Sequence, residues 1–136
     1  MSALSTAIEI YRWLHDLLAN DATLASLVSG VYADAAPQDA TPPYVVVALV
    51  GTDEVMGIGR PLAERVLVDI TAVDDQGLDR IGAIMDRVQE LLRDAGGAAG
   101  ARQVAGVAPL GLSVRSEFAG DRLWRAATSQ YAVILS

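Results

Sequence analysis

The sequence predicts an α+β domain in which two main helices pack on a mostly antiparallel sheet of four to five strands, in the order α-α-β-β-α-β-β. Three observations support this prediction. Apolar residues recur every three or four positions in two long segments, and they alternate or run together in four others; no segment resembles a linker or a repeat. At this length, residues 1–136 are expected to form a single domain.

The first helix is predicted over residues 3–19 from the spacing of its apolar residues. Its apolar stripe consists of Leu4, Ala7, Ile8, Tyr11, Leu14 and Leu18. Asp21 is well placed to cap a short second helix, which Gly30 ends. Three prolines within residues 33–43 then predict a loop, because proline disrupts regular helix.

The first two strands are predicted at residues 44–50 and 65–73. The run 44–50 is apolar at every position and rich in valine, which is typical of a central strand buried on both faces. In 65–73 the apolar residues alternate with polar ones, so that one face is expected to be buried. The polar, glycine-containing segment 51–61 between them is expected to be a protruding, flexible hairpin loop.

The second long helix is predicted over residues 77–94. Its buried stripe is expected to consist of Leu78, Ile81, Ile84, Met85, Val88, Leu91 and Leu92. The Gly/Ala-rich segment 95–109 that follows is expected to lack regular structure, either as a mobile loop or as one that becomes ordered on a partner. Two closing strands are predicted at about 110–118 and 123–135.

The composition is unusually apolar. Hydrophobic residues make up 52% of the chain and the mean hydropathy is +0.34, yet only 5% of the residues are aromatic. The core must therefore be built mainly from aliphatic side chains. The high share of hydrophobic residues has two explanations that the sequence leaves open. Either the protein keeps apolar surface for an obligate assembly, or a high alanine content inflates the count.

The charge is acidic and unevenly distributed. Residues 1–59 hold seven acids against one Arg, whereas residues 60–136 hold ten acids against nine Arg, and the net charge is −7. Binding to the phosphates of DNA requires a basic face, so this balance argues against a DNA-binding protein. DNA could still pass the protein without being held.

No arrangement of catalytic or metal-binding residues is found. The chain has no Cys and one His, which excludes disulfides, thiolate sites and a His-based metal cluster within one subunit. His15 is interpreted as a surface or partly buried helix residue, and the GxG at 57–59 lacks the third glycine of a dinucleotide motif. Asp74, Asp75 and Asp79 are interpreted as capping residues at a helix start. We therefore expect no enzyme activity, no cofactor and no metal.

No targeting segment is predicted either. Charged residues interrupt the apolar pattern of the N-terminus, which is unlike a signal peptide. The longest apolar run, 44–50, is far shorter than the roughly 20 residues needed to cross a bilayer. The protein is expected to stay in the cytoplasm, or in a particle assembled there, without contacting a membrane.

An ordered series of short motifs links the first 50 residues to a known family. These are a helix ending in Leu-Leu-x-x-Asp, a short Leu-x-x-Leu-Val helix, a Tyr-x-x-x-Ala-Pro-Gln loop and a strand entered through Pro-Tyr-Val. They are carried by Leu17, Leu18, Asp21, Leu24, Leu27, Val28, Gly30, Tyr32, Ala36, Pro37, Gln38, Pro43, Tyr44 and Val45. This combination resembles the opening of phage tail-completion, or tail-terminator, proteins. Beyond it only the layout agrees, and Ser29 and the Gly/Ala-rich segment 95–109 depart from the pattern.

The resemblance implies a structural protein of the virion, assembled in the host cytoplasm. Such a protein forms a ring, commonly hexameric, at the head-proximal end of the tail tube. It stops polymerisation of the tail tube protein and joins the tail to the head-tail connector or stopper protein. DNA passes through the lumen of the ring without specific binding.

Two groups of residues are candidates for contacts in such a ring. The tip of the 51–61 hairpin offers a partner-contact loop made of Met56, Ile58 and Arg60. An acidic lumen would repel DNA phosphates, so some of the acids in the N-terminal half are expected to face it. These acids are Asp34, Asp39, Asp53 and Glu54.

Three other functions remain open. The first is a different head-tail joining ring, such as a stopper or adaptor on the connector side. The second is a small cytoplasmic ligand-binding or regulatory domain that oligomerises through its sheet, which predicts a persistent small-molecule pocket. The third, a small hydrolase or mutase, would require a cluster of titratable groups in a cleft, and the sequence offers none.

Overall fold

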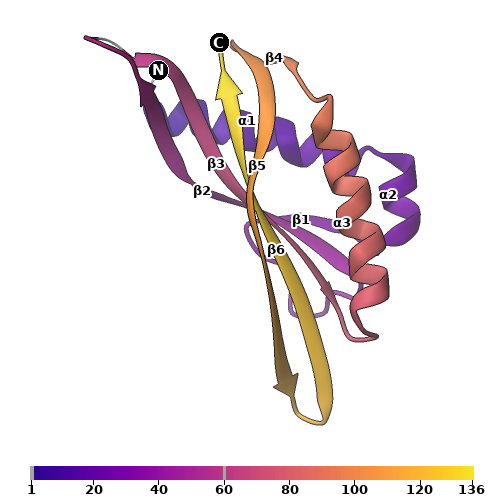
Figure 1. Ribbon diagram of the computed structural model, residues 1–136. Helices are drawn as coiled ribbons and strands as arrows, with labels where there is room; N and C mark the ends of the chain where they lie inside the picture. Colours follow the sequence, from indigo (N-terminus) through magenta and orange to yellow (C-terminus); the bar gives the residue numbers. More distant parts are fainter. Residues whose placement is uncertain (1, 60) are drawn as a thin grey trace.

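The computed structural model describes residues 2–59 and 61–136 and confirms the α+β class (Figure 1). The elements, in chain order, are α1 (Ala3–Ala19), α2 (Ala22–Leu27), β1 (Val31–Ala33), β2 (Tyr44–Met56), β3 (Pro61–Asp74), α3 (Leu78–Arg93), β4 (Gly97–Ala99), β5 (Arg102–Ala119) and β6 (Arg122–Leu135). The described strands form one sheet in the order β1-β2-β3-β6-β5-β4. All neighbours are antiparallel except β1 and β2, which are parallel.

The helices cover one face of this sheet. Along β3 the residues Val66, Val68, Ile70 and Ala72 are at most 1% exposed, while the residues between them are partly exposed. This alternation confirms the predicted buried face of the second strand. The opposite face of the sheet carries no helix in the described part of the chain (Figure 1).

The prediction that residues 44–50 form a strand buried on both faces was wrong. Val45 and Val47 are fully buried, but Val46 and Ala48 on the other face are partly exposed, and Val50 is 49% exposed. The strand also lies second from the edge, between β1 and β3. A run of valines shows only that a strand is apolar, and it does not tell whether a second layer covers its outer face.

The two main helices supply most of the helical part of the core. From α1 come Ala7, Ile10, Tyr11, Leu14 and Leu18, and from α3 come Ile81, Ile84, Val88 and Leu92. Leu4 and Leu78 were expected in these stripes but are 64% and 43% exposed. Each lies at the N-terminal end of its helix, before the first core contact.

Both segments predicted as flexible loops are largely strand. Residues 51–56 complete β2 and pair with β3, which leaves only a short turn at the end of this hairpin. Residues 97–99 form β4, and 102–109 are the first half of β5. The Gly, Ala and Pro content of 95–109 gives little strand propensity, so the pairing with β6 imposes this conformation.

Two short edge strands were also missed, which brings the sheet to six strands in the described residues. β1 is only three residues long and precedes a proline-containing loop. β4 is a Gly-Ala-Ala segment. Segments this short carry no readable period, so only the structure reveals them.

Ion pairs attach the helices to the rest of the fold. Asp21 caps α2, as predicted, by accepting the Leu24 N–H at 2.8 Å. The same carboxylate accepts two bonds from Arg87 of α3, at 2.9 and 2.7 Å, and this guanidinium holds the pKa of Asp21 below its usual value. One side chain thus joins α2 to α3.

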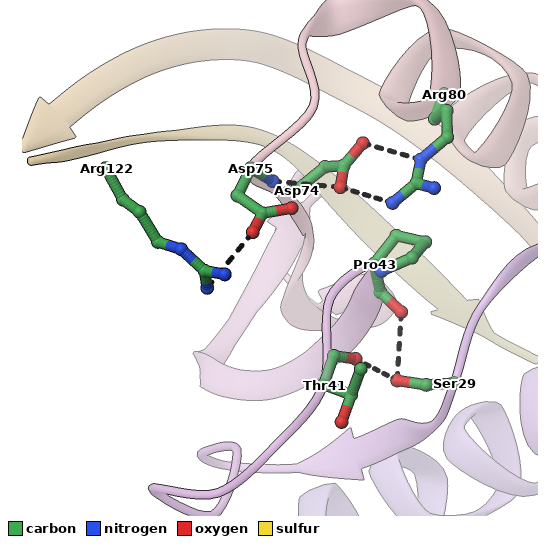
Figure 2. A network of polar contacts seen from close by, with 7 residues as sticks. All are labelled: Ser29, Thr41, Pro43, Asp74, Asp75, Arg80 and Arg122. Carbon is green, nitrogen blue, oxygen red and sulfur yellow. Dashed lines mark hydrogen bonds and ion pairs between the residues drawn. The ribbon is translucent and has the colours of Figure 1, made fainter. Parts of the chain in front are cut away.

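The acids before α3 do not cap it through their side chains as predicted. The N-cap is Gly77, and no side chain makes a cap bond there. Its φ of 111° explains why glycine stands at this position, since this backbone conformation favours glycine. Asp74 is instead fully buried and accepts two hydrogen bonds from Arg80, at 2.8 and 2.6 Å (Figure 2). This pair connects the end of β3 to the first turn of α3.

Candidate functional site

The tip of the β2–β3 hairpin exposes two large apolar side chains, at the position where the sequence predicted a protruding loop. Met56 is 61% exposed and Ile58 is fully exposed. Gly59 has a φ of 79°, which allows the chain to turn there. Arg60, the third predicted residue of this contact loop, lies outside the described residues.

The four acids proposed for a lumen fall into two separate places. Asp34 follows β1 and Asp39 lies in the loop after it, near the start of β2. Asp53 and Glu54 lie near the other end of β2, toward the hairpin tip. The structure therefore does not bring the four together as one cluster.

Asp53 is partly neutralised within its own subunit. Its carboxylate accepts two hydrogen bonds from Arg65 of β3, the residue opposite it in the ladder, at 2.7 and 2.5 Å. These bonds hold the pKa of Asp53 below its usual range. Glu54, in contrast, is exposed and makes no ion pair with the described residues.

Asp34 lies beside the buried end of Tyr11. It has a φ of 67°, a conformation that aspartate tolerates better than most residues. Burial, and secondarily the Asp34 carboxylate, raise the pKa of Tyr11 to about 12. Within the described part of the chain the Tyr11 hydroxyl has no hydrogen-bond partner.

His15 has a structural contact. Its Nε2 lies 2.9 Å from the Val31 carbonyl oxygen of β1, and its ring is partly buried. The second ring nitrogen lies 3.4 Å from the Asp16 carboxylate. These contacts join α1 to the edge of the sheet, as expected for a partly buried helix residue.

A long β-hairpin made of β5 and β6 is the most exposed part of the molecule. Every residue from 109 to 122 is exposed, and the end of the hairpin projects away from the helices (Figure 1). We call residues 110–125 the arm. β3 pairs with β6 only as far as Arg125, so the tip of the arm extends beyond its neighbouring strand. Arg122, near this tip, bonds back to Asp75 at 3.3 Å (Figure 2).

The arm exposes apolar side chains on the helix side of the sheet. Leu112 is 66% exposed, Val114 53% and Phe118 73%. Leu112 and Val114 also line a shallow groove of about 520 Å³ against α3, where Leu78 and Met85 form part of the other wall. An exposed apolar surface of this kind is typical of a protein–protein contact.

The arm's role as a surface was missed at the sequence level, although a signal was present. Every second residue from 112 to 118 is apolar, with Ser116 as the one exception. The residues between them include the charged Arg115 and Glu117. This alternation predicts a strand with one apolar face. It does not reveal that no other part of the same subunit covers that face.

The described residues form no recognisable metal site. They contain no group of three or more His, Cys, Asp or Glu side chains arranged to hold a metal ion. A surface groove of about 380 Å³ lies beside Pro37, Tyr44 and Trp124, and the side chains that line it include no nucleophile paired with a base. Among the same residues, none of the helices combines the length and the apolar character that crossing a bilayer requires.

Comparisons with known proteins identify the family of the chain and a structure with a similar fold. The sequence profile of the family described as tail completion protein gp17 matches residues 12–136. A solved structure described as the virion of a native gene transfer agent particle contains a chain with the same fold, at 19% sequence identity and a TM-score of 0.71, over 100% of both chains. No curated protein matches the sequence closely enough to count. Since the profile spans almost the whole sequence, the chain belongs to the tail completion protein gp17 family.

Proposed function

We propose that this protein is a non-enzymatic subunit of a phage-like particle that closes into a ring of six subunits on the head-proximal end of the tail tube. The ring ends polymerisation of the tube protein and joins the tail to the head connector. The observation that carries the proposal is the family match over residues 12–136. The similarity of fold to a chain of a gene transfer agent virion supports it.

The surface of the subunit is compatible with this function. A ring subunit needs a rigid body together with apolar surface that becomes covered on assembly. The helix-covered half of the sheet provides the first, with core residues such as Leu14 and Ile84 at most 1% exposed. The arm and the β2–β3 tip provide the second, through side chains such as Phe118 and Ile58.

The lumen is proposed to be acidic, so that DNA passes without being held. Some of the acids of the N-terminal half, Asp34, Asp39, Asp53 and Glu54, face it in this proposal. Asp53 contributes least to the repulsion of phosphates because Arg65 neutralises much of its charge. A map of the assembled ring that placed all four on the outer rim would contradict this part.

The test is to add the purified chain to tail tube protein during polymerisation and to measure tube lengths by electron microscopy. Capping predicts short tubes with a ring at one end, and lengths that fall as more chain is added. The mass of the chain alone, from light scattering over a concentration series, gives the number of subunits in any ring. The same chain, heat-denatured beforehand, is the control.

Two other results would redirect the proposal. Binding to connector proteins, with no effect on tube length, would indicate a stopper or adaptor ring. A compact monomer or dimer that ignores tubes and retains a small molecule through purification would indicate a ligand-binding domain.

A further inference from the structure

Both edges of the sheet are mostly uncovered in the described part of the chain. β1 pairs with β2 only from Val45 to Val47, so that residues 48–56 of β2 have a neighbour on one side alone. At the opposite edge, β4 pairs with β5 only over 102–104, which leaves 105–119 equally open. An open edge presents unpaired backbone N–H and C=O groups that can pair with another strand.

The exposed apolar side chains concentrate on these same two strands. Of the nine large apolar side chains exposed in the described residues, three lie on β2 and its tip and four lie on β5. They are Val50, Met56 and Ile58, and Leu110, Leu112, Val114 and Phe118. Unpaired backbone and uncovered apolar surface thus coincide at both edges.

We propose that the open edge of β5 in one copy pairs with the open edge of β2 in the next copy, so that the sheet continues from subunit to subunit. This inference rests on the ring of the proposed function and names the surface that builds it. The contact joins two different surfaces, and such a head-to-tail contact can be repeated around a closed ring.

The strand directions favour this pairing. From β2 through β3 and β6 to β5 every neighbour is antiparallel, so β5 runs opposite to β2 within one subunit. A rotation about a ring axis along the strands keeps these directions. It therefore brings β5 of one copy antiparallel to β2 of the next and keeps the helices of all copies on the same side of the sheet.

The charged side chains of the two edges differ. On β2, Asp53 is bonded to Arg65 and Glu54 makes no ion pair with the described residues. The open part of β5 carries one base and one acid, Arg115 and Glu117, and has no net charge. Arg115 makes no ion pair with the described residues, so it is available to a neighbour. Pairing β5 with β5 of a second copy would leave the β2 edge uncovered.

Irregularities in β5 limit where the pairing can occur. The ladder with β6 shifts register at Ala105 and at Leu110, and Pro109 between them has no N–H to donate. From Gly111 to Ala119 the ladder is regular. On β2 the regular stretch beyond its own shift is Gly51–Val55. These two stretches are the ones we expect to pair.

The test uses cysteine crosslinking, in which only the introduced cysteines can react because the chain has no Cys of its own. Thr52→Cys is combined in turn with Leu112→Cys, Val114→Cys and Ser116→Cys; all four positions lie on the helix side of the sheet and on exposed sites. A short bifunctional maleimide tolerates a shift of one or two residues. The matched control combines Ser26→Cys on α2, also exposed, with Val114→Cys.

The readout is the ladder of covalent multimers on a denaturing gel, together with light scattering on the unmodified chain. A ladder that ends at the ring size with at least one β2–β5 pair, and that is tenfold weaker with the control, supports the inference. Rings that form from the wild-type chain without such a ladder overturn the edge pairing and leave the proposed function intact. A wild-type chain that forms no ring, alone or on tail tubes, overturns both.

Discussion

β3 and the arm are built from similar residues and differ in what covers them. In β3, Val66 and Val68 alternate with other residues and are at most 1% exposed beneath the helices. In the arm, Leu112 and Val114 alternate in the same way and are 66% and 53% exposed. The same pattern thus serves the core in one strand and the surface in the other, because burial depends on the second layer and not on the strand itself.

The largest expected effect is a difference in the free energy of unfolding between two Val→Ala variants, one in β3 and one in the arm. Val68→Ala removes two methyl groups from a fully buried site and is expected to lower the free energy of unfolding by about 2 kcal/mol. Val114→Ala, at a half-exposed site, is expected to change it by less than about 0.5 kcal/mol. Urea unfolding of both variants at a concentration that keeps the chain monomeric measures the difference. Equal losses would mean that the arm is part of the folding core.

A charge on the arm is expected to affect assembly rather than folding. Val114→Lys would place an ammonium group at the proposed contact and raise the concentration at which the oligomer dissociates at least tenfold, or about 1.4 kcal/mol. Light scattering on a dilution series measures this shift. Ser26→Lys on α2 serves as the matched control and should leave it unchanged. If Val114→Lys lowered the melting temperature and left assembly intact, the roles of the two regions would be reversed.

The helical side of the comparison can be tested through Asp21. Asp21→Ala removes the cap of α2 and the partner of Arg87, and is expected to cost about 1 kcal/mol near neutral pH. The folded-state pKa of Asp21 is lowered, so its contribution is present above the unfolded value of about 4 and is lost as the pH falls through the folded value. The gap between wild type and variant should therefore shrink from about pH 6 to about pH 3. Asp86→Ala, an exposed acid of α3, should show no comparable gap.

The smallest expected effect concerns the Tyr11 hydroxyl. Because this hydroxyl has no hydrogen-bond partner among the described residues, Tyr11→Phe should alter stability by less than about 1 kcal/mol at neutral pH. The folded-state pKa of Tyr11 is raised to about 12. Its stabilising contribution is thus complete below the unfolded value of about 10 and is lost as the pH rises toward 12. Raising the pH to about 11 should therefore lower the free energy of unfolding more in wild type than in the Tyr11→Phe variant, as measured by urea unfolding. An equal loss in both would contradict the raised pKa of Tyr11.

The sequence predicted the elements whose apolar residues recur regularly over many positions, and it missed the elements that lack such a pattern. The spacing of Leu14 and Leu18, and of Ile81, Ile84 and Val88, identified both main helices, and the alternation of β3 identified its buried face. β4 consists of Gly and Ala, and the first half of β5 mixes Gly, Ala and Pro with two valines; the conformation of both is set by pairing with neighbouring strands. No local pattern encodes that pairing.

The candidate site divides in the same way. Met56 and Ile58 could be found because they lie at the hairpin tip, where Ile58 has a glycine on either side and apolar residues have no core to enter. The arm could not be recognised as surface, because its exposure depends on where α3 and β3 end relative to it. The separation of Asp34 and Asp39 from Asp53 and Glu54 likewise follows from the extended length of β2.

The open edges have a consequence for the free subunit in solution. Before a ring closes, the same backbone groups and apolar side chains are available to any strand they meet, including those of misaligned copies. The net charge of −7 supplies the colloidal repulsion that opposes such encounters near neutral pH. That repulsion disappears near the isoelectric point of about 4.4, so the free subunit should precipitate there while still folded. Ring closure would then serve solubility as well as assembly, by removing both adhesive edges at once.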